Sequence, residues 1–303
     1  MNKRYCLITI AAAVLLAVCP GSKAGAAGVT IAPAYKDVTI RDQQFVEVPI
    51  QLANSSDRAM TFAVEVRDFG ALDDSGGVSV SSGNRANKYG LKDYVTLDVS
   101  QLVIEPKKRG KVIATISNAA SLSPGGHYGA VVFTLQDASG SGHIPVKQEI
   151  ASLLFVAKEG GDGPKLSTAK MDFQTSLFSL PREVDIVIAN DGNVHATPSG
   201  TLQLKDPRGR TLFSSPINSA NGKVLPETVR KFVLGVSTTK RLLVPGRYTL
   251  EVVSNGVTAR RQFMLVPLAS LPIIAGGLAL LGMACFVLRK RGSWLYRKIR
   301  PKA

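Results

Sequence analysis

An uncharged apolar stretch near the C-terminus constrains this chain more than any other feature of its sequence. Residues 265–288 form a run of 24 positions without a charged side chain. At about 1.5 Å rise per residue, a helix of this length reaches roughly 36 Å, which is enough to cross a bilayer with some tilt. The stretch therefore predicts one membrane-spanning helix.

The tail that follows this stretch is basic. Residues 289–303 contain seven Lys or Arg residues and no acidic residue. Basic flanks stay in the cytoplasm, and Trp and Tyr rings favour the headgroup layer. We expect a cytoplasmic C-terminus and an interface anchor made by Arg289, Lys290, Arg291, Trp294 and Tyr296. A partner-binding tail is the less favoured interpretation of the two aromatic rings.

The N-terminus has the pattern of a targeting signal. Lys3 and Arg4 precede an apolar stretch at 5–18, and small residues follow up to Ala27. This order is typical of a cleaved secretory signal, and the apolar part is too short to favour the alternative of an uncleaved anchor. We expect a single-pass cell-membrane protein with most of its chain outside the cytoplasm.

The charge and the cysteines exclude several classes of function for the exported region. The formal net charge is +15, but ten of the 37 basic residues lie in the two terminal segments, which leaves 27 against 22 acidic residues between them. Nucleic-acid binding loses its main support, and the basic tail suits anionic lipid. The three cysteines, Cys6, Cys19 and Cys285, all lie in the predicted signal or helix, so disulfides and thiolate metal sites are not expected outside the membrane.

Strand periodicity dominates the region between the two apolar segments. Apolar residues alternate with polar ones at 46–52, 62–66, 112–116 and 184–188, and Asn255-Gly256 is a strong hairpin signal. Short strands with frequent turns predict an all-β ectodomain of two tandem antiparallel immunoglobulin-like β-sandwich domains, followed by the one C-terminal transmembrane helix. The expected divisions are a signal peptide at 1–27, a first domain at 28–157, a glycine-rich linker at 158–165, a second domain at 166–262, the helix at 263–288 and the tail at 289–303. Residues 70–92 are the least strand-like part of the first domain and are expected to form a long loop.

Sequence motifs of catalysis and metal binding are lacking. The three histidines, His127, His143 and His195, are not at metal-ligand spacing, and there is no nucleophile elbow, zinc-protease motif or phosphate loop. We expect no enzyme activity, no cofactor, no metal and no small-molecule substrate. An extracytoplasmic hydrolase with an unrecognised site is the least favoured alternative.

Several motifs resemble those of the WxL-interacting surface proteins, a two-domain, membrane-anchored family of Gram-positive cells. They include the segments at 52–57 and 104–111, the run Pro124-Gly-Gly-His-Tyr128 with the apolar residues after it, and in the second half the segments at 190–193 and 245–248. The resemblance implies two β-rich domains, the first in contact with peptidoglycan and the second with other proteins. The segment after Val66 and the short second half depart from the family pattern.

Together these features predict a membrane-anchored adhesion or scaffold protein that binds cell-wall polymer or other surface proteins. Its expected contact residues are Lys107, Lys108, Arg109, Lys111, His127 and Tyr128. For the basic residues at 107–111, the alternative is a solvated hairpin. A membrane-tethered assembly factor, which lends an edge strand to secreted subunits, remains the alternative function.

Overall fold

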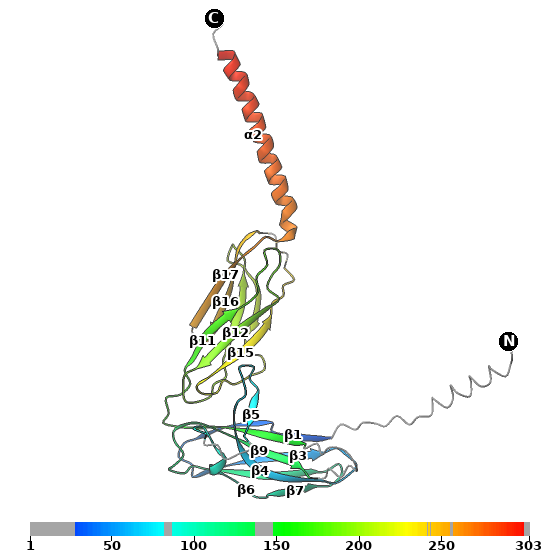
Figure 1. The fold of residues 1–303 in the computed structure, drawn as a ribbon, viewed down its shortest axis with the longest axis vertical. Coiled ribbons are helices and arrows are strands. Elements are labelled where there is room, and N and C mark those ends of the chain that lie inside the picture. The colour runs from blue at the N-terminus through cyan, green and yellow to red at the C-terminus, as the bar shows by residue number, and fades with distance from the viewer. Residues whose placement is uncertain are drawn as a thin grey trace, which may run out of the picture.

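The computed structural model describes residues 28–81, 87–136, 148–240, 242, 244–254 and 257–299, with the side chains of 169 and 290–299 left out. Two β-rich domains follow one another and lead into a long C-terminal helix (Figure 1). The expected signal peptide at 1–27 and His143 lie outside the described residues. The all-β fold class with one C-terminal helix is confirmed.

Domain one is a sandwich of two sheets. One sheet has the order β1-β3-β8-β6, and the other has the order β2-β10-β9-β4-β5 with β7 also paired to β4. The strands are β1 (Val29–Ala32), β2 (Tyr35–Ile40), β3 (Phe45–Asn54), β4 (Met60–Ala71), β5 (Val78–Val80), β6 (Val95–Leu97), β7 (Gln101–Ile104), β8 (Arg109–Ser117), β9 (Gly125–Leu135) and β10 (Glu149–Lys158), with a 3₁₀ turn, η1, at Lys92–Tyr94.

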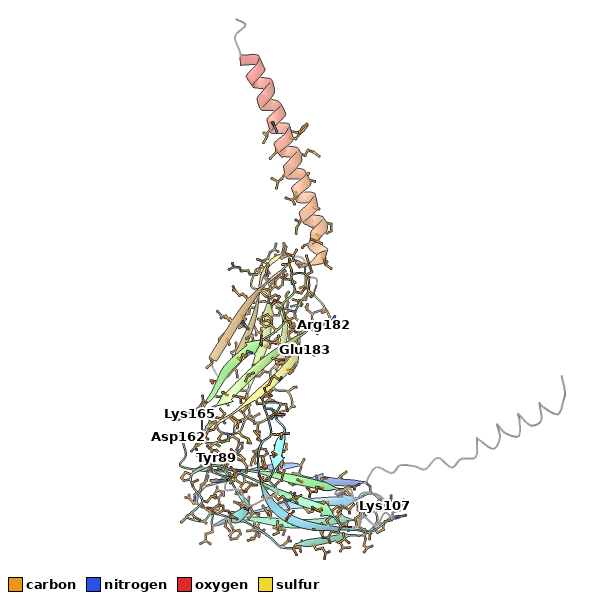
Figure 2. All side chains as sticks on the ribbon, viewed as in Figure 1. Tyr89, Lys107, Asp162, Lys165, Arg182 and Glu183 are labelled. Carbon is orange, nitrogen blue, oxygen red and sulfur yellow. The ribbon has the colours of Figure 1, made fainter. Side chains whose placement is uncertain are left out.

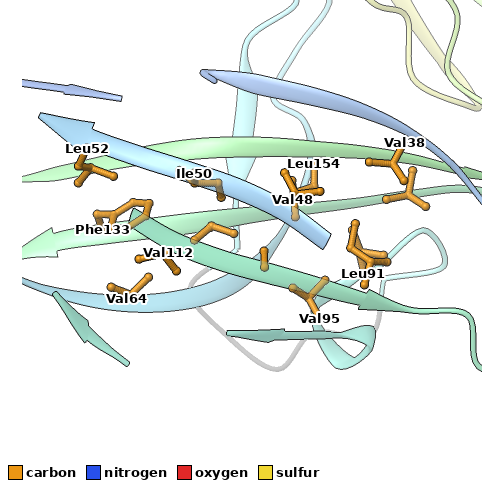
Figure 3. Packing of buried hydrophobic residues seen from close by; sticks show 14 of the residues in the cluster. Val38, Val48, Ile50, Leu52, Val64, Leu91, Val95, Val112, Phe133 and Leu154 are labelled. Atoms are coloured by element: carbon orange, nitrogen blue, oxygen red, sulfur yellow. The ribbon is translucent and has the colours of Figure 1, made fainter. Parts of the chain in front are cut away.

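The core of domain one lies between its two sheets. Alternate residues of β3 and β8 point inward and are buried, as the period-two pattern predicts. Figure 3 shows Ile50 and Val112 of one sheet facing Phe133 and Leu154 of the other. This contact between apolar faces joins the two layers.

One strand pair departs from the expected antiparallel arrangement. The N-terminal segment pairs first with β3 and then, after Pro33, with the other sheet, where β2 runs parallel to β10. Proline has no backbone N–H to give to a ladder, so pairing is interrupted there and the chain can change sheets. Because β2 keeps the direction of β1, it enters the second sheet parallel to its neighbour.

Domain two is a smaller sandwich with sheet orders β11-β12-β15 and β14-β13-β16-β17. Its strands are β11 (Leu166–Asp172), β12 (Glu183–Asn190), β13 (Gly200–Lys205), β14 (Thr211–Pro216), β15 (Thr228–Gly235), β16 (Gly246–Ser254) and β17 (Val257–Leu265). The predicted hairpin is confirmed by the register, in which Ser254 pairs with Val257, while the turn residues 255 and 256 lie outside the described part. Its strands run along the long axis of the molecule, whereas those of domain one run across it (Figure 1).

The same side-chain device closes a strand in each domain. Asn54 at the end of β3 is buried and donates from Nδ2 to the carbonyl of Ile104 at 3.0 Å. Asn190 at the end of β12 is also buried and donates to the carbonyl of Val224 at 3.1 Å. A buried backbone carbonyl needs a hydrogen-bond donor, and the side-chain amide of each asparagine supplies one at the edge of its sandwich.

The C-terminal helix begins after a short connection. A 3₁₀ turn, η2 (Leu268–Ser270), leads into α2 (Leu271–Ile299). Among the described residues, one helical segment, Leu268–Arg289, is long and apolar enough to cross a membrane. The second domain extends further than expected, because β17 continues to Leu265, and the helix therefore starts later than 263. Lys290, Arg291, Trp294 and Tyr296 continue the helical backbone, and Arg289 ends the candidate span.

Leu154 tests the core of domain one. Replacing it with Ala leaves a cavity between the sheets and should lower the free energy of unfolding by about 2–5 kcal/mol. Urea denaturation of the full chain in detergent micelles measures this loss. Val103→Ala, on an exposed position of β7, is the control and should change stability by less than about 0.5 kcal/mol. Equal effects of the two substitutions would contradict the assigned core.

Candidate functional site: the groove between the domains

A hairpin of domain one reaches across to domain two. Residues 70–92 were expected to form a long loop, but β4 continues to Ala71 and turns back into β5. At the tip, the carbonyl of Asp74 accepts a hydrogen bond from the backbone N–H of Lys231 on β15, with a distance of 2.6 Å. The sequence pattern missed the hairpin because its turn is rich in Gly, Asp and Ser and its second strand has three residues. This part of the chain therefore serves as a strut between the domains.

Two glycines make room for the Arg230 side chain between the β4–β5 hairpin and domain two. A Cβ atom at Gly76 would lie 2.2 Å from the Arg230 guanidinium carbon, and one at Gly222 would lie 2.6 Å from it. Gly76 also has a φ of +89°, in the region that favours glycine. The guanidinium thus lies between the hairpin tip of domain one and a loop of domain two.

A chain of polar contacts runs through the buried part of the junction. The Tyr128 hydroxyl on β9 accepts a hydrogen bond from the His195 backbone N–H at 2.9 Å and lies 3.3 Å from its Nδ1. The other ring nitrogen of His195 is 3.1 Å from Asp37 Oδ1, and Lys223 Nζ is 2.9 Å from Asp37 Oδ2. The geometry fits a neutral imidazole that accepts from Tyr128 and donates to Asp37.

Burial governs the titration of this network. It raises the pKa of the Tyr128 hydroxyl, which therefore stays protonated. Burial also lowers the pKa of His195 and the nearby Lys223 charge lowers it further, while Asp37 partly offsets both effects. His195 is consequently neutral at pH 7. Aromatic rings surround the network, with the Phe155 ring centroid 5.3 Å from that of His195 and 5.9 Å from that of Tyr128.

The linker also contributes to the junction. Asn193, in the loop after β12, donates its backbone N–H to the carbonyl of Gly163 at 3.2 Å and accepts from Gly163 N–H through Oδ1 at 3.1 Å. Its own carbonyl accepts from Gly126 of domain one at 2.7 Å. Glu159 of the same segment donates its backbone N–H to the carbonyl of Ile40 at 3.0 Å, so the glycine-rich segment is hydrogen-bonded to both domains. Figure 2 shows its residues Asp162 and Lys165 at the level of the junction.

Next to the network lies an open cavity of about 280 Å³, which forms the groove between the domains. Its apolar lining includes Tyr35, Leu153, Phe155, Leu225 and Val229. Two cations, Lys223 and Arg230, also line it. Lys223 is paired with Asp37 and lies over the rings of Phe155 and Tyr35.

Arg230 differs from Lys223 because it has no ion pair within the described part of the chain. Its Nη1 donates to the Lys223 carbonyl at 2.9 Å, and its Nε–H is buried without a hydrogen-bond partner among these residues. Burial alone lowers the pKa of Arg230, with no acidic neighbour to offset it. Asp73 also lines the cavity, but its Oδ1 accepts hydrogen bonds from the Ser75 backbone and hydroxyl, at 2.8 and 2.6 Å. Arg230 is therefore the group most in need of an anionic partner.

The predicted contact residues fall into two separate groups. Tyr128 is 1% exposed, and His127 is buried with its ring nitrogens 3.2 and 2.8 Å from the carbonyls of Gly90 and Ser123. Lys107 lies at the opposite end of domain one, far from Tyr89 (Figure 2), and pairs there with Asp57 at 2.9 Å. Lys108 lies beside Lys107 in the turn, whereas Arg109 and Lys111 are part of β8. The two groups do not form one site, and the role of each in binding stays a prediction.

The sequence did not point to four polar residues of the junction, Arg230, Lys223, Asp37 and His195. They come from segments that are far apart in the chain, and none carries a local motif. His195 was noted only as a histidine without metal-ligand spacing. Among the described residues, no cluster of three or more His, Cys, Asp or Glu side chains could hold a metal ion.

Comparisons with known proteins give distant matches to solved structures. No protein-family model and no curated protein matches the sequence. A chain from a chaperone–tip adhesin complex of CFA/I fimbriae biogenesis is 12% identical, with coverage of 80% of this chain and 100% of that chain and a TM-score of 0.41. The class 5 fimbriae chaperone CfaA is 13% identical, with coverage of 79% and 100% and a TM-score of 0.39. The Pseudomonas aeruginosa CupB2 chaperone is 10% identical, with coverage of 76% and 98% and a TM-score of 0.35. At these scores the likeness carries no argument about function, and the resemblance to WxL-interacting proteins stays a prediction.

Protonation of His195 should weaken the fold. The pKa of His195 is lowered in the folded chain, whereas in the unfolded chain it keeps its ordinary value of 6.5. Near pH 6.5 the unfolded chain therefore binds more protons than the folded chain. The free energy of unfolding should therefore decrease as the pH falls from about 7.5 through about 6.5. Urea denaturation at a series of pH values measures the effect. His195→Gln keeps a hydrogen-bond donor toward Asp37 but cannot be protonated, so the free energy of unfolding should change less with pH. An unchanged pH dependence would mean that other groups cause the effect.

Gly76→Ala should destabilise the junction by at least about 1 kcal/mol, because the positive φ and the Arg230 guanidinium both exclude a Cβ atom. The measurement is the free energy of unfolding. Gly70→Ala, on the same β4–β5 segment, is the matched control, since a Cβ atom there meets nothing within 4 Å. Similar losses for the two variants would argue against the contact between Arg230 and the hairpin.

Proposed function

We propose that this chain is a non-catalytic, membrane-tethered binding protein that holds a segment of another surface polypeptide in the groove between its domains. The α2 helix would anchor the chain, with the two sandwiches on the extracytoplasmic side and the basic residues after Leu288 in the cytoplasm. The observation that carries this proposal is Arg230, a cation at the edge of an apolar cavity that has no ion pair with any residue the structure describes.

The chemistry of the groove selects its partner. An arginine guanidinium pairs with a carboxylate through two parallel hydrogen bonds, and Arg230, which lines the cavity, carries the donors for such a pair. The walls made by Tyr35, Phe155 and Leu225 suit an apolar side chain next to that carboxylate. A cavity of about 280 Å³ admits one or two side chains and not a folded domain. The partner therefore presents a carboxylate on an apolar segment.

The second candidate is an assembly factor that pairs an edge strand with a secreted subunit, and the position of β15 favours it. This strand pairs with β12 alone, at the edge of its sheet. Because the Lys231 N–H points outward to Asp74, the N–H groups of Val229 and Val233 point outward as well. These valines are 43% and 54% exposed, so an extended segment could continue the sheet.

Site-specific photocrosslinking in the native cell tests both candidates. A benzophenone amino acid at Val229 should form an adduct with a polypeptide, and Arg230→Gln in the same chain should reduce that adduct at least about tenfold, since the charged pair is lost. Val103, exposed on domain one, is the control position. Adducts at Val229 that are insensitive to Arg230→Gln, or as frequent at Val103, would contradict the groove as a binding site.

A crosslinker at Val233 separates the two candidates. The assembly-factor function requires adducts at Val233 as well as at Val229, with a client that is not yet folded. The binding-protein function requires adducts at Val229 with a folded partner. Each variant is first checked for an unchanged unfolding transition, so that a loss of adduct reports on binding.

Contact of residues 107–111 with peptidoglycan is a separate proposal. Lys107 lies at the end of domain one far from the groove, where its Nζ also donates to the carbonyl of Ser55 at 2.6 Å. Sedimentation of the full chain with purified sacculi, with and without neutralisation of Lys107, Lys108, Arg109 and Lys111, tests it. Equal sedimentation of both forms would remove these residues from the function.

A further inference from the structure

Two exposed apolar side chains lie beside the point where the chain leaves domain two for the helix. Leu177 and Phe178, in the loop between β11 and β12, are 48% and 50% exposed. The carbonyl of Leu177 accepts a hydrogen bond of 2.7 Å from the backbone N–H of Val266, two residues before η2. The loop is therefore fixed to the start of the anchor.

With α2 as the membrane anchor, on which this inference rests and which is part of the proposed function, the length of the anchor places this loop at the membrane surface. The candidate span Leu268–Arg289 has 22 residues, which reach about 33 Å at ~1.5 Å each and only just exceed the ~30 Å hydrocarbon core. Leu268 must then lie close to the edge of the hydrocarbon region. Two extended residues span at most about 7 Å, so Val266 lies within the headgroup layer. Leu177, bonded to Val266, lies there too.

The loops at this end of domain two are also basic. In the strand register, Gly246 pairs with Leu265 and Lys205 pairs with Thr249, so the β13–β14 turn and the β15–β16 loop lie at the same end as the exit to the helix. Their exposed cations, together with that of the β11–β12 loop, are Arg182, Arg208, Arg210 and Lys240. Figure 2 shows Arg182 on the helix side of Lys165.

Acidic residues balance this charge only in part, because Asp172 and Glu183 border the β11–β12 loop and line a hollow together with Arg182. The sequence has no Asp or Glu at 173–182 or 236–245, and the β13–β14 turn holds Asp206 alone. Asp206 is buried and pairs with Arg210 at 2.8 Å. With Glu183 next to Arg182 and Asp206 paired with Arg210, Arg208 and Lys240 still leave a net positive charge at the end of domain two that carries Leu177 and Phe178.

We propose that this membrane-proximal surface binds lipid directly, in addition to the spanning helix. Leu177 and Phe178 insert at the boundary between headgroups and acyl chains, and Arg182, Arg208 and Lys240 contact anionic headgroups. The ectodomain then stands on the leaflet at two points, the helix and this loop, and cannot rotate freely about its connection.

Depth-dependent quenching tests the proposal on the full chain in nanodiscs. Trp294→Phe removes the single tryptophan, and Phe178→Trp then reports on the loop. Nanodiscs contain phosphatidylglycerol or phosphatidylcholine, each with or without dibrominated acyl chains. Val103→Trp, in domain one, is the negative control, and Leu268→Trp, at the start of the span, is the positive control.

Insertion predicts blue-shifted emission of Phe178→Trp and about threefold quenching by brominated phosphatidylglycerol, with no quenching of Val103→Trp. Arg182→Gln, Arg208→Gln and Lys240→Gln together should reduce the quenching in phosphatidylglycerol toward the phosphatidylcholine level. Solvent-like emission of Phe178→Trp without quenching, while Leu268→Trp is quenched, would overturn the proposal. Quenching that is equal in both lipids and unaffected by the three substitutions would overturn the role of the cations.

Discussion

The hydroxyl group of Tyr128 lies at the junction on which the arrangement of the two sandwiches depends. It comes from the face of β9 opposite the inter-sheet core and meets both a backbone N–H and a ring nitrogen of His195 in domain two. Because both groups are buried, an unpaired group on either side would cost free energy, and the bonds favour one relative placement of the domains. The hairpin contact of Asp74 with Lys231 and the linker bonds of Asn193 act at other points of the same junction. The cavity and the position of Arg230 follow from this placement.

The pattern of apolar residues was sufficient to predict the layers but not the junction. Val48, Ile50 and Leu52 alternate with polar neighbours and are buried as expected, because strand periodicity is a local property. Asp37 and His195 are 158 positions apart, and nothing in the sequence near either residue indicates the other. Tyr128 was singled out through a motif resemblance, yet its hydroxyl faces domain two and not solvent. Long-range polar contacts of this kind depend on the tertiary fold, which periodicity does not encode.

Charge on this molecule is sorted by position. At the end of domain one away from the helix, Lys107 is neutralised by Asp57, whereas in the groove Lys223 is shared between Asp37 and two aromatic rings. Among the described residues, the cations without an ion pair include Arg230 at the junction and Arg208 and Lys240 around the exit to the helix. The net charge of +15 for the whole chain is therefore concentrated in a few places and is not spread evenly over the surface. Such local charge acts over about one Debye length, roughly 10 Å in salt, so the two places act independently.

The direction and length of the strands in domain two set the distance between the groove and the start of α2. These strands run from the groove to the end of the domain that carries α2 (Figure 1), and β16, with nine residues, spans about 30 Å at ~3.3 Å per residue. A sandwich is stiff along its strands, because each residue of a central strand is hydrogen-bonded to its neighbours. Domain two is thus a spacer of fixed length, and with α2 as the proposed membrane anchor it would hold the groove about 30 Å above the lipid. The length of these strands therefore decides which partners, at what height above the surface, can meet Arg230.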